Sequence, residues 1–174
     1  MDSYVLALDV GTSACHCLLT DIEGSHVGTA TAPMHYYTPE GCPELAREFE
    51  PNKVITTLGE LVGKVLQSSE VKPGSIAAIA LTSQRQGLVF LDDRGRELYC
   101  GPNIDLRAIF EGAVIDEELG DEVYKTTGHF PSLLLAPASL LRRGRHTTSC
   151  HPFATISVLS RARSPCILWL TPKL

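Results

Sequence analysis

A run of six apolar residues, Ile76-Ala77-Ala78-Ile79-Ala80-Leu81, restricts the possible folds of this chain more than any other segment. A strand without polar positions is expected in the middle of a sheet, where both of its faces are buried. Residues 54–66, just before it, carry apolar side chains at helical spacing and so predict an amphipathic helix that begins near Pro51. Gly59 and Gly63 lie inside this helix and indicate either close approach of another backbone or a merely weak helix.

The remaining apolar segments extend this pattern of strands and helices. Three strands joined by turns are expected over residues 4–8, 15–20 and 26–32, and a further strand over 88–91. Helical spacing returns in residues 105–119, and a short helix from Asp121 should stop at Thr127-Gly128. This order predicts an α/β fold with a mixed sheet and helices packed on it.

Composition excludes several classes of protein. The net charge of −5 argues against nucleic-acid binding, which depends on Lys and Arg neutralising phosphates. No apolar run approaches the ~20 residues that span a bilayer, and the run at residues 4–8 is too short for a signal peptide. We therefore expect a cytoplasmic protein without membrane contact, whose six cysteines are reduced thiols.

The charge is distributed unevenly along the chain. All 20 acidic residues lie before residue 140, whereas six basic residues and no acidic one follow it. A folded domain rarely changes composition so abruptly. We expect a domain over residues 1–141, followed by a divergent or frameshifted basic tail over 142–174.

A carboxylate and a glycine turn follow the first predicted strand. Backbone amides of the turn Gly11-Thr12-Ser13, with its two hydroxyls, can surround phosphate oxygens. Asp9 beside bound phosphates would be repelled unless a cation intervened, which indicates Mg²⁺ held through its waters. No Gly-Lys-Ser/Thr follows, so this is not a Walker P-loop, and an ordinary hairpin turn is the alternative.

Two later segments carry polar side chains suited to a polyhydroxylated ligand. Gln84, Arg85 and Gln86 follow the strand that ends at Leu81, at the sheet edge where ligands of α/β proteins bind. Asn103, Asp105 and Arg107 precede the second helix. The alternatives are a solvated loop for the first segment and, for the second, an Asp105 helix cap with Arg107 as a surface charge.

Together these segments resemble the N-terminal domain of the FGGY family of carbohydrate kinases, relatives of glycerol kinase and xylulokinase. The resemblance runs from Tyr4 to Leu141 and includes Asp9-Val10-Gly11-Thr12-Ser13, Glu48-Phe49-Glu50-Pro51, Ile76–Gly87, Asn103–Arg107, Thr127-Gly128 and Ala136-Pro137. It implies the ribonuclease-H-like fold of the actin, Hsp70 and sugar-kinase superfamily.

The resemblance implies roles for these residues in ATP-dependent phosphorylation of a sugar or polyol hydroxyl. Asp9 would hold Mg²⁺ through water, Gly11, Thr12 and Ser13 would bind the phosphates of ATP, and sugar hydroxyls would be bound by Gln84, Arg85, Gln86, Asn103, Asp105 and Arg107. The family's general-base Asp would lie beyond Leu174, and His16 replaces a common Lys or Arg.

We therefore expect an incomplete kinase that is inactive alone and has no catalytic residue of its own. The alternative is a non-catalytic sugar- or nucleotide-binding module that assembles with a separately encoded C-terminal kinase domain. A metal site at Cys15-His16-Cys17 is not expected, because strand geometry points His16 away from both cysteines.

Overall fold

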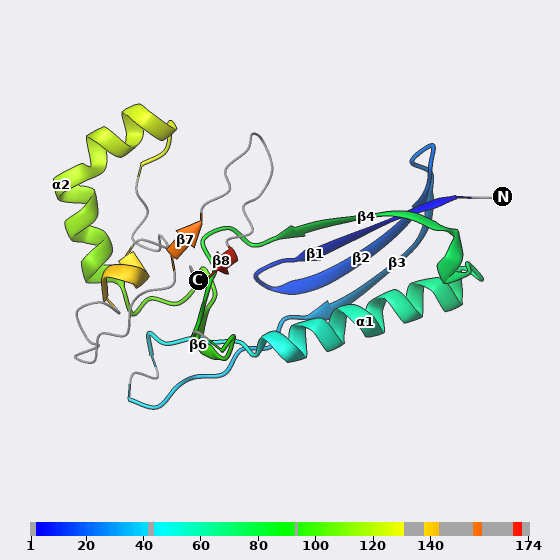
Figure 1. Cartoon of the computed structure of the whole chain (residues 1–174), viewed down its shortest axis with the longest axis horizontal. Coiled ribbons are helices and arrows are strands. Elements are labelled where there is room, and N and C mark those ends of the chain that lie inside the picture. Colours follow the sequence, from blue (N-terminus) through cyan, green and yellow to red (C-terminus); the bar gives the residue numbers. More distant parts are fainter. Residues whose placement is uncertain are drawn as a thin grey trace. The chain divides into compact units, whose positions relative to one another are not determined.

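The computed structural model describes residues 3–41, 44–92, 94–130 and 138–142, together with the backbone of 155–157 and 169–171 (Figure 1). The chain divides into two compact units. The described part of the first unit comprises residues 3–35 and 49–84, and the second contains residues 36–48 and the segments that follow residue 84. Of the predicted tail over 142–174, the structure describes only residue 142 and the backbone of 155–157 and 169–171, so the divergent character of the tail stays a prediction.

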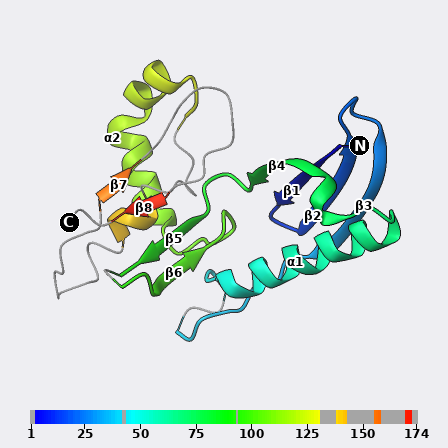
Figure 2. The same ribbon diagram turned by 45° about the vertical axis from the view of Figure 1, so that its right-hand side comes forward.

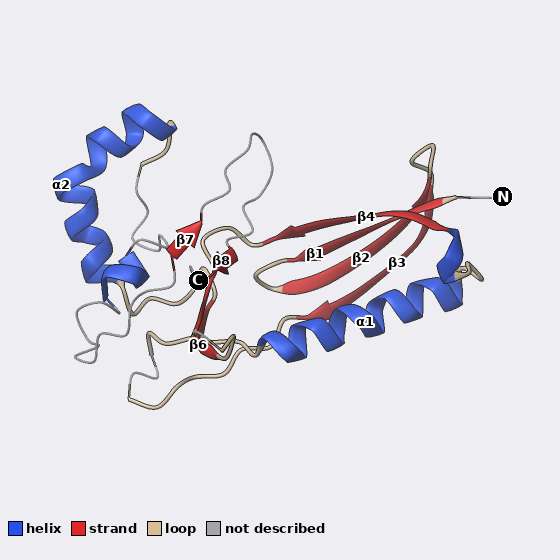
Figure 3. Cartoon of the chain, in the orientation of Figure 1, coloured by secondary structure: helices blue, strands red, loops and turns tan. Residues whose placement is uncertain are grey.

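The first unit contains a four-stranded sheet (Figure 3). Its strands are β1 (Tyr4–Val10), β2 (Ala14–Asp21), β3 (His26–Pro33) and β4 (Ile76–Ser83), in the spatial order β3-β2-β1-β4. β1 pairs with β2 and β2 with β3 in antiparallel fashion, whereas β1 and β4 are parallel. The prediction of a mixed sheet is therefore confirmed.

One long helix covers part of this sheet. α1 (Pro51–Ser68) begins at the proline that the sequence places in its first turn, and it packs against β2 and β3 (Figures 1 and 2). Leu61 and Val65 of α1 and Leu19 of β2 are fully buried. A Cβ atom at Gly28 of β3 would collide with the Ser69 side chain, so helix and strand approach closely there.

β4 is not the buried central strand that its composition predicts. It lies at one edge of the sheet, and its residues 77–81 are exposed, with 66% exposure for Ile79 and 50% for Leu81. The reason is that α1 packs on β2 and β3 and that no described strand pairs with the outer side of β4. A 3₁₀ turn, η1 (Pro73–Ser75), leads from the helix into this strand.

The glycines inside α1 do not serve a close contact. A Cβ atom at Gly59 or Gly63 would meet nothing within 4 Å. Close approach of another backbone is therefore the wrong interpretation for this chain. Both glycines simply weaken the helix, because glycine loses more backbone entropy on folding than alanine does.

The second unit contains a hairpin of β5 (Leu88–Leu91) and β6 (Glu97–Gly101). Leu88, Phe90 and Tyr99 form its buried cluster, against which Leu140 packs, and the two aromatic rings stack with centroids 5.4 Å apart. β6 is not among the predicted strands, because its five residues mix polar and apolar side chains without strict alternation. β7 (Thr155–Ser157) and β8 (Trp169–Thr171) form a separate antiparallel pair.

α2 (Ile109–Thr127) is a single helix where the sequence predicts a helix over 105–119 and a short second one. It ends at Gly128, whose left-handed φ of 74° is the predicted stop. Within the described part of the chain no helix combines the length and apolar character needed to cross a membrane. Cys15, Cys17 and Cys100 are free thiols, as expected.

Candidate functional site

The turn between β1 and β2 is built from backbone contacts. The Gly11 N–H donates to the Ala14 carbonyl at 2.9 Å, and the Ser13 carbonyl accepts the Met34 N–H at 2.9 Å. A Cβ atom at Gly11 would lie 2.9 Å from the Ala14 oxygen and 3.8 Å from Asp9 Oδ2. Only glycine fits there without moving the backbone, and the Asp9 carboxylate lies beside the turn.

Asp9 belongs to a polar row that crosses the sheet. It lies in register with His16 on β2 and with Thr82 on β4, and His16 lies in register with Thr31 on β3. Residues in register on neighbouring strands share one face of a sheet. His16 Nδ1 is 3.0 Å from Thr31 Oγ1, and the His16 side chain is exposed. The row therefore gathers a carboxylate, an imidazole and two hydroxyls on one open face.

Cys15 and Cys17 lie on the opposite face of β2 from His16. Both thiols are buried, and burial raises their pKa values, with the charge of Asp9 raising that of Cys15 further. A protonated buried thiol is a poor metal ligand. Across the described ranges no group of three or more His, Cys, Asp or Glu side chains is arranged to hold a metal ion.

The carboxyl ends of β1 and β4 meet at one edge of the sheet. The Gln84 N–H donates to the Val10 carbonyl at 2.7 Å, so the residues after β4 begin beside the Gly11 turn. The structure thereby brings Gln84 to the predicted phosphate turn. Arg85 and Gln86 belong to the second unit; both are exposed, and Gln86 has a left-handed φ of 68°, a conformation that a side chain disfavours.

Asp105 and Arg107 form a buried ion pair in the second unit. Arg107 Nε lies 3.0 Å from Asp105 Oδ1, and Arg107 Nη2 lies 2.6 Å from Asp105 Oδ2. Asp105 is 6% exposed, and the Arg107 side chain is 19% exposed. Both alternatives are therefore wrong: Arg107 is not a surface charge, and the cap of α2 is Ala108 rather than Asp105.

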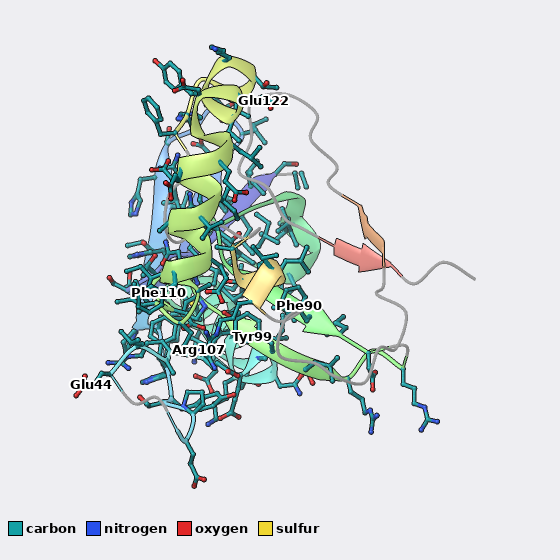
Figure 4. All side chains as sticks on the ribbon, turned by 90° about the vertical axis from the view of Figure 1, so that its left-hand side faces the viewer. Glu44, Phe90, Tyr99, Arg107, Phe110 and Glu122 are labelled. Atoms are coloured by element: carbon teal, nitrogen blue, oxygen red, sulfur yellow. The ribbon has the colours of Figure 1, made fainter. Side chains whose placement is uncertain are left out.

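Glu48 and Tyr99 make further hydrogen bonds to this ion pair. Arg107 Nη2 also donates to Glu48 Oε1 at 2.7 Å, and the Tyr99 hydroxyl donates to Asp105 Oδ2 at 2.6 Å. The Arg107 guanidinium lies 5.2 Å from the centre of the Tyr99 ring (Figure 4). Tyr37 donates to Glu48 Oε2 at 2.9 Å, and the backbones of these two residues exchange hydrogen bonds. We call Glu48, Tyr99, Asp105 and Arg107 the arginine cluster.

The arginine cluster shifts the pKa values of its members. Burial raises the pKa of the Tyr99 phenol well above its usual value, and the hydrogen bond to Asp105 and its charge add to the effect. Burial alone would lower the pKa of Arg107, but its hydrogen bonds to Asp105 and Glu48 raise it above the ordinary value. The guanidinium therefore stays charged, and the phenol stays protonated as a donor.

Tyr99 and Tyr37 have no role that the sequence alone predicts. No motif marks them, since each is one aromatic residue in a segment of mixed polarity. In the sequence, Glu48 stands out only as part of the segment Glu48-Phe49-Glu50-Pro51. Asn103, which precedes the cluster in sequence, is half-buried in the second unit. Ala136-Pro137 lies outside the described residues.

Comparisons with known proteins agree on one family. Residues 4–136 match the N-terminal domain of the FGGY family of carbohydrate kinases. Autoinducer-2 kinase of Escherichia coli (strain K12) is 27% identical over 161 residues, and its counterpart from Salmonella typhimurium (strain LT2) is 25% identical. These alignments cover 90% of this chain and 30% of each relative, so the chain spans about a third of the curated relatives' length.

Solved structures show the same fold. Gluconate kinase from Lactobacillus acidophilus superposes with a TM-score of 0.72 at 22% identity, covering 84% of this chain and 29% of that one. Xylulose kinase from the same organism gives a TM-score of 0.71 at 22% identity and covers 83% and 29%. The fold is therefore the ribonuclease-H-like fold that sugar kinases share with actin and Hsp70. Since the family match spans most of the chain, this protein belongs to the FGGY family of carbohydrate kinases and corresponds to its N-terminal domain.

Proposed function

We propose that this chain supplies the phosphate-binding part of an ATP-dependent kinase that phosphorylates a hydroxyl of a sugar or polyol. The observation that carries the proposal is the Gly11 turn, where a Cβ atom would clash with the backbone and the Asp9 carboxylate lies alongside. Membership of a family of carbohydrate kinases supports the same reaction. Phosphoryl transfer depends mainly on positioning and on neutralising charge, and a phosphate-binding turn contributes to both.

Each residue of the turn has a proposed task toward Mg²⁺·ATP. The amides and hydroxyls of Gly11, Thr12 and Ser13 donate hydrogen bonds to phosphate oxygens. Asp9 suits Mg²⁺, which binds through one or two carboxylates and keeps several of its waters. When bound, the ion neutralises phosphate charge. His16 lies in register with Asp9, at the place where the resemblance implies a Lys or Arg.

The sugar-binding residues remain proposals. Gln84, Arg85, Gln86 and Asn103 carry polar groups suited to hydroxyls. The polar atoms of Asp105 and Arg107 are bonded within the arginine cluster. We propose that the main role of this ion pair is to hold the segment that carries Asn103 in place.

A complete kinase needs more than these residues. By resemblance, the general base belongs to a further domain, which we propose is supplied by a separate polypeptide or by further sequence. Alone, the chain should bind sugar only at millimolar concentration, because each hydrogen bond in an open site contributes only about 1 kcal/mol. Free thiols and a use of ATP both suit the cytoplasm, where we propose that the protein acts.

A second candidate function is a non-catalytic module that binds nucleotide or sugar. An assay of ADP release with a panel of pentuloses and polyols separates the two functions in the presence of a complementing domain. Robust turnover by residues 1–174 alone would show that our assignment of the general base is wrong.

Calorimetry with ADP, with and without Mg²⁺, tests the phosphate turn. We expect Mg²⁺ to strengthen ADP binding to the wild-type chain, and Asp9→Asn to abolish that strengthening. Asp121→Asn, which changes an exposed carboxylate of α2, is the matched control and should behave as wild type. If Asp9→Asn and wild type respond equally to Mg²⁺, the proposed role of Asp9 is incorrect.

A further inference from the structure

Gly101 of β6 leaves room for the side chain of Tyr99. The two residues lie two positions apart on one strand and therefore share one of its faces. A Cβ atom at Gly101 would collide with the hydroxyl oxygen of Tyr99 and with the ring carbon that carries it. The φ of Gly101 is not positive, so glycine is needed here for space and not for backbone freedom. The Tyr99 ring therefore lies along its own strand, over Gly101.

Contacts of the Tyr99 ring fix the position of its hydroxyl. The ring is 9% exposed and stacks on Phe90 with centroids 5.4 Å apart, and the Arg107 guanidinium lies 5.2 Å from its centre (Figure 4). In this position the hydroxyl donates to Asp105 Oδ2 at 2.6 Å. A larger residue at position 101 would move the hydroxyl away from Asp105.

The carboxylate of Asp105 is fully used within the chain. Its Oδ1 accepts the backbone N–H of Arg107 at 3.2 Å and the Nε–H of the same residue at 3.0 Å. Its Oδ2 accepts Arg107 Nη2 and the Tyr99 hydroxyl, each at 2.6 Å. A carboxylate has about four acceptor positions, and these bonds occupy all of them. Asp105 therefore has no acceptor position left for a hydroxyl of a ligand.

Asp105 also ends the turn that carries Asn103. The Asp105 N–H donates to the Pro102 carbonyl at 3.1 Å, so Asn103 and Ile104 are the two central residues of a β-turn. The next N–H, that of Leu106, donates to the Leu45 carbonyl at 2.9 Å. We call residues 102–105 the Asn103 turn. Because Asp105 is its last residue, the orientation of the Asp105 side chain sets the position of the turn.

We propose that Tyr99 is the positioning residue of the Asn103 turn and that Asp105 is an internal anchor, not a ligand of the sugar. The Tyr99 hydroxyl keeps Asp105 oriented toward Arg107, and the turn then presents the Asn103 amide to a hydroxyl of the ligand. An amide both donates and accepts hydrogen bonds, so it can bind a hydroxyl in either role. The identity of the ligand rests on the proposed function, whereas the role of Tyr99 rests on contacts within the second unit.

Tyr99→Phe removes the hydroxyl and keeps the ring, and xylitol, a neutral polyol, is the probe. In an NMR titration of the full chain we expect xylitol to shift the side-chain amide resonances of Asn103. Its dissociation constant should be about fivefold higher in Tyr99→Phe, which corresponds to one net hydrogen bond. Tyr37→Phe is the matched control, because that hydroxyl donates to Glu48 of the same cluster, and its affinity for xylitol should equal that of the wild type.

Amide hydrogen exchange without ligand tests the positioning directly. In Tyr99→Phe the N–H groups of Asp105 and Leu106 should exchange about fivefold faster, because the turn opens more often. The Gly112 N–H, which donates to Ala108 at the start of α2, should exchange as in the wild type. Gly101→Ala displaces the hydroxyl without removing it and should reproduce the faster exchange at Asp105 and Leu106.

Four results would overturn the proposal. The first is unchanged exchange at Asp105 and Leu106 in Tyr99→Phe, and the second is a uniform rise across the second unit, which would indicate general loss of stability. The third is faster exchange with unchanged affinity for xylitol, which would make Tyr99 merely structural. The fourth is a xylitol-induced shift of the Asp105 carboxyl carbon in the wild type as large as that of Asn103, because Asp105 would then be a ligand of the sugar.

The two measurements keep this proposal and the proposed function apart. Faster exchange at Asp105 and Leu106 in Tyr99→Phe, without binding of xylitol or any sugar of the panel to the wild type, would contradict sugar binding by this segment and leave the role of Tyr99 standing. Binding of xylitol at Asn103 with the same affinity and the same exchange in both proteins would do the reverse.

Discussion

The Gly11 turn of the first unit and the arginine cluster of the second unit are held by different forces. The turn depends on backbone hydrogen bonds between residues close in sequence, such as Gly11 to Ala14. The arginine cluster depends on side-chain charges, and its bond from Arg107 to Glu48 joins residues 59 positions apart. The first region should therefore be sensitive to backbone geometry, and the second to the loss of a single charge.

The largest effect that distinguishes the two regions is expected from Arg107→Ala. This change leaves the buried carboxylate of Asp105 and the partly buried carboxylate of Glu48 without their cation, and breaking a buried pair costs about 3–5 kcal/mol. Because the Arg107 side chain is 19% exposed, we expect about 3 kcal/mol in the free energy of unfolding, measured with urea.

Arg96→Ala is the matched control for that experiment. Arg96 pairs with Asp92 at 2.6 Å, but its side chain is 72% exposed, and such surface pairs contribute about 0–1 kcal/mol. Similar losses for Arg107→Ala and Arg96→Ala would mean that the arginine cluster is not held by buried charge.

The contrast also explains what could be predicted from the sequence. The sequence predicts that Asp9 and the Gly11 turn come at the end of one strand and Gln84 after another, and the structure has this arrangement, because the apolar pattern of both strands is clear. In the sequence, by contrast, the members of the arginine cluster appear only as isolated residues. Nothing in the sequence pairs Glu48 with Arg107, and the alternatives considered for Asp105 and Arg107 were local ones.

The fold was predictable except where burial depends on a neighbour. The strands of the first unit and α1 follow from apolar spacing. The composition of β4 indicates a central strand, and the structure places it at an edge. An apolar pattern shows which environment a strand suits, but it does not show whether another strand pairs with it.

Gly11→Ala tests the region held by backbone geometry. The added methyl group would lie 2.9 Å from the Ala14 carbonyl oxygen, so the turn must shift. Forcing a group into a filled site costs about 1–3 kcal/mol, and we expect a thermal transition lowered accordingly together with weaker Mg²⁺-dependent ADP binding. Unchanged nucleotide binding would show that phosphate recognition does not depend on the shape of the turn.

High pH should weaken the second unit through Cys100. Burial, and then the charges of Glu97 and Glu48, raise the pKa of this thiol to about 12. Above the ordinary thiol pKa the unfolded chain loses this proton while the folded chain keeps it, so stability falls as pH rises, by up to about 1.4 kcal/mol per pH unit for one group. The difference between the thermal transitions at pH 8 and pH 10 should be smaller in Cys100→Ala than in the wild type, and the remaining difference includes the contribution of Cys15 and Cys17, whose pKa values are also raised. An identical pH dependence in both proteins would rule out Cys100 as the source.

The smallest effect is expected from Gly63→Ala, the counterpart of Gly11→Ala at a glycine without a structural task. A methyl group at Gly63 would meet nothing within 4 Å in the middle of α1. Alanine is favoured over glycine inside a helix by about 0.5–1 kcal/mol, so the free energy of unfolding should increase by that amount. ADP binding should be unchanged, because α1 packs on β2 and β3 on the face opposite to the row of Asp9. A loss of stability would show that another chain or segment approaches α1 at this position. Gly63 would then have a structural task, as Gly11 does.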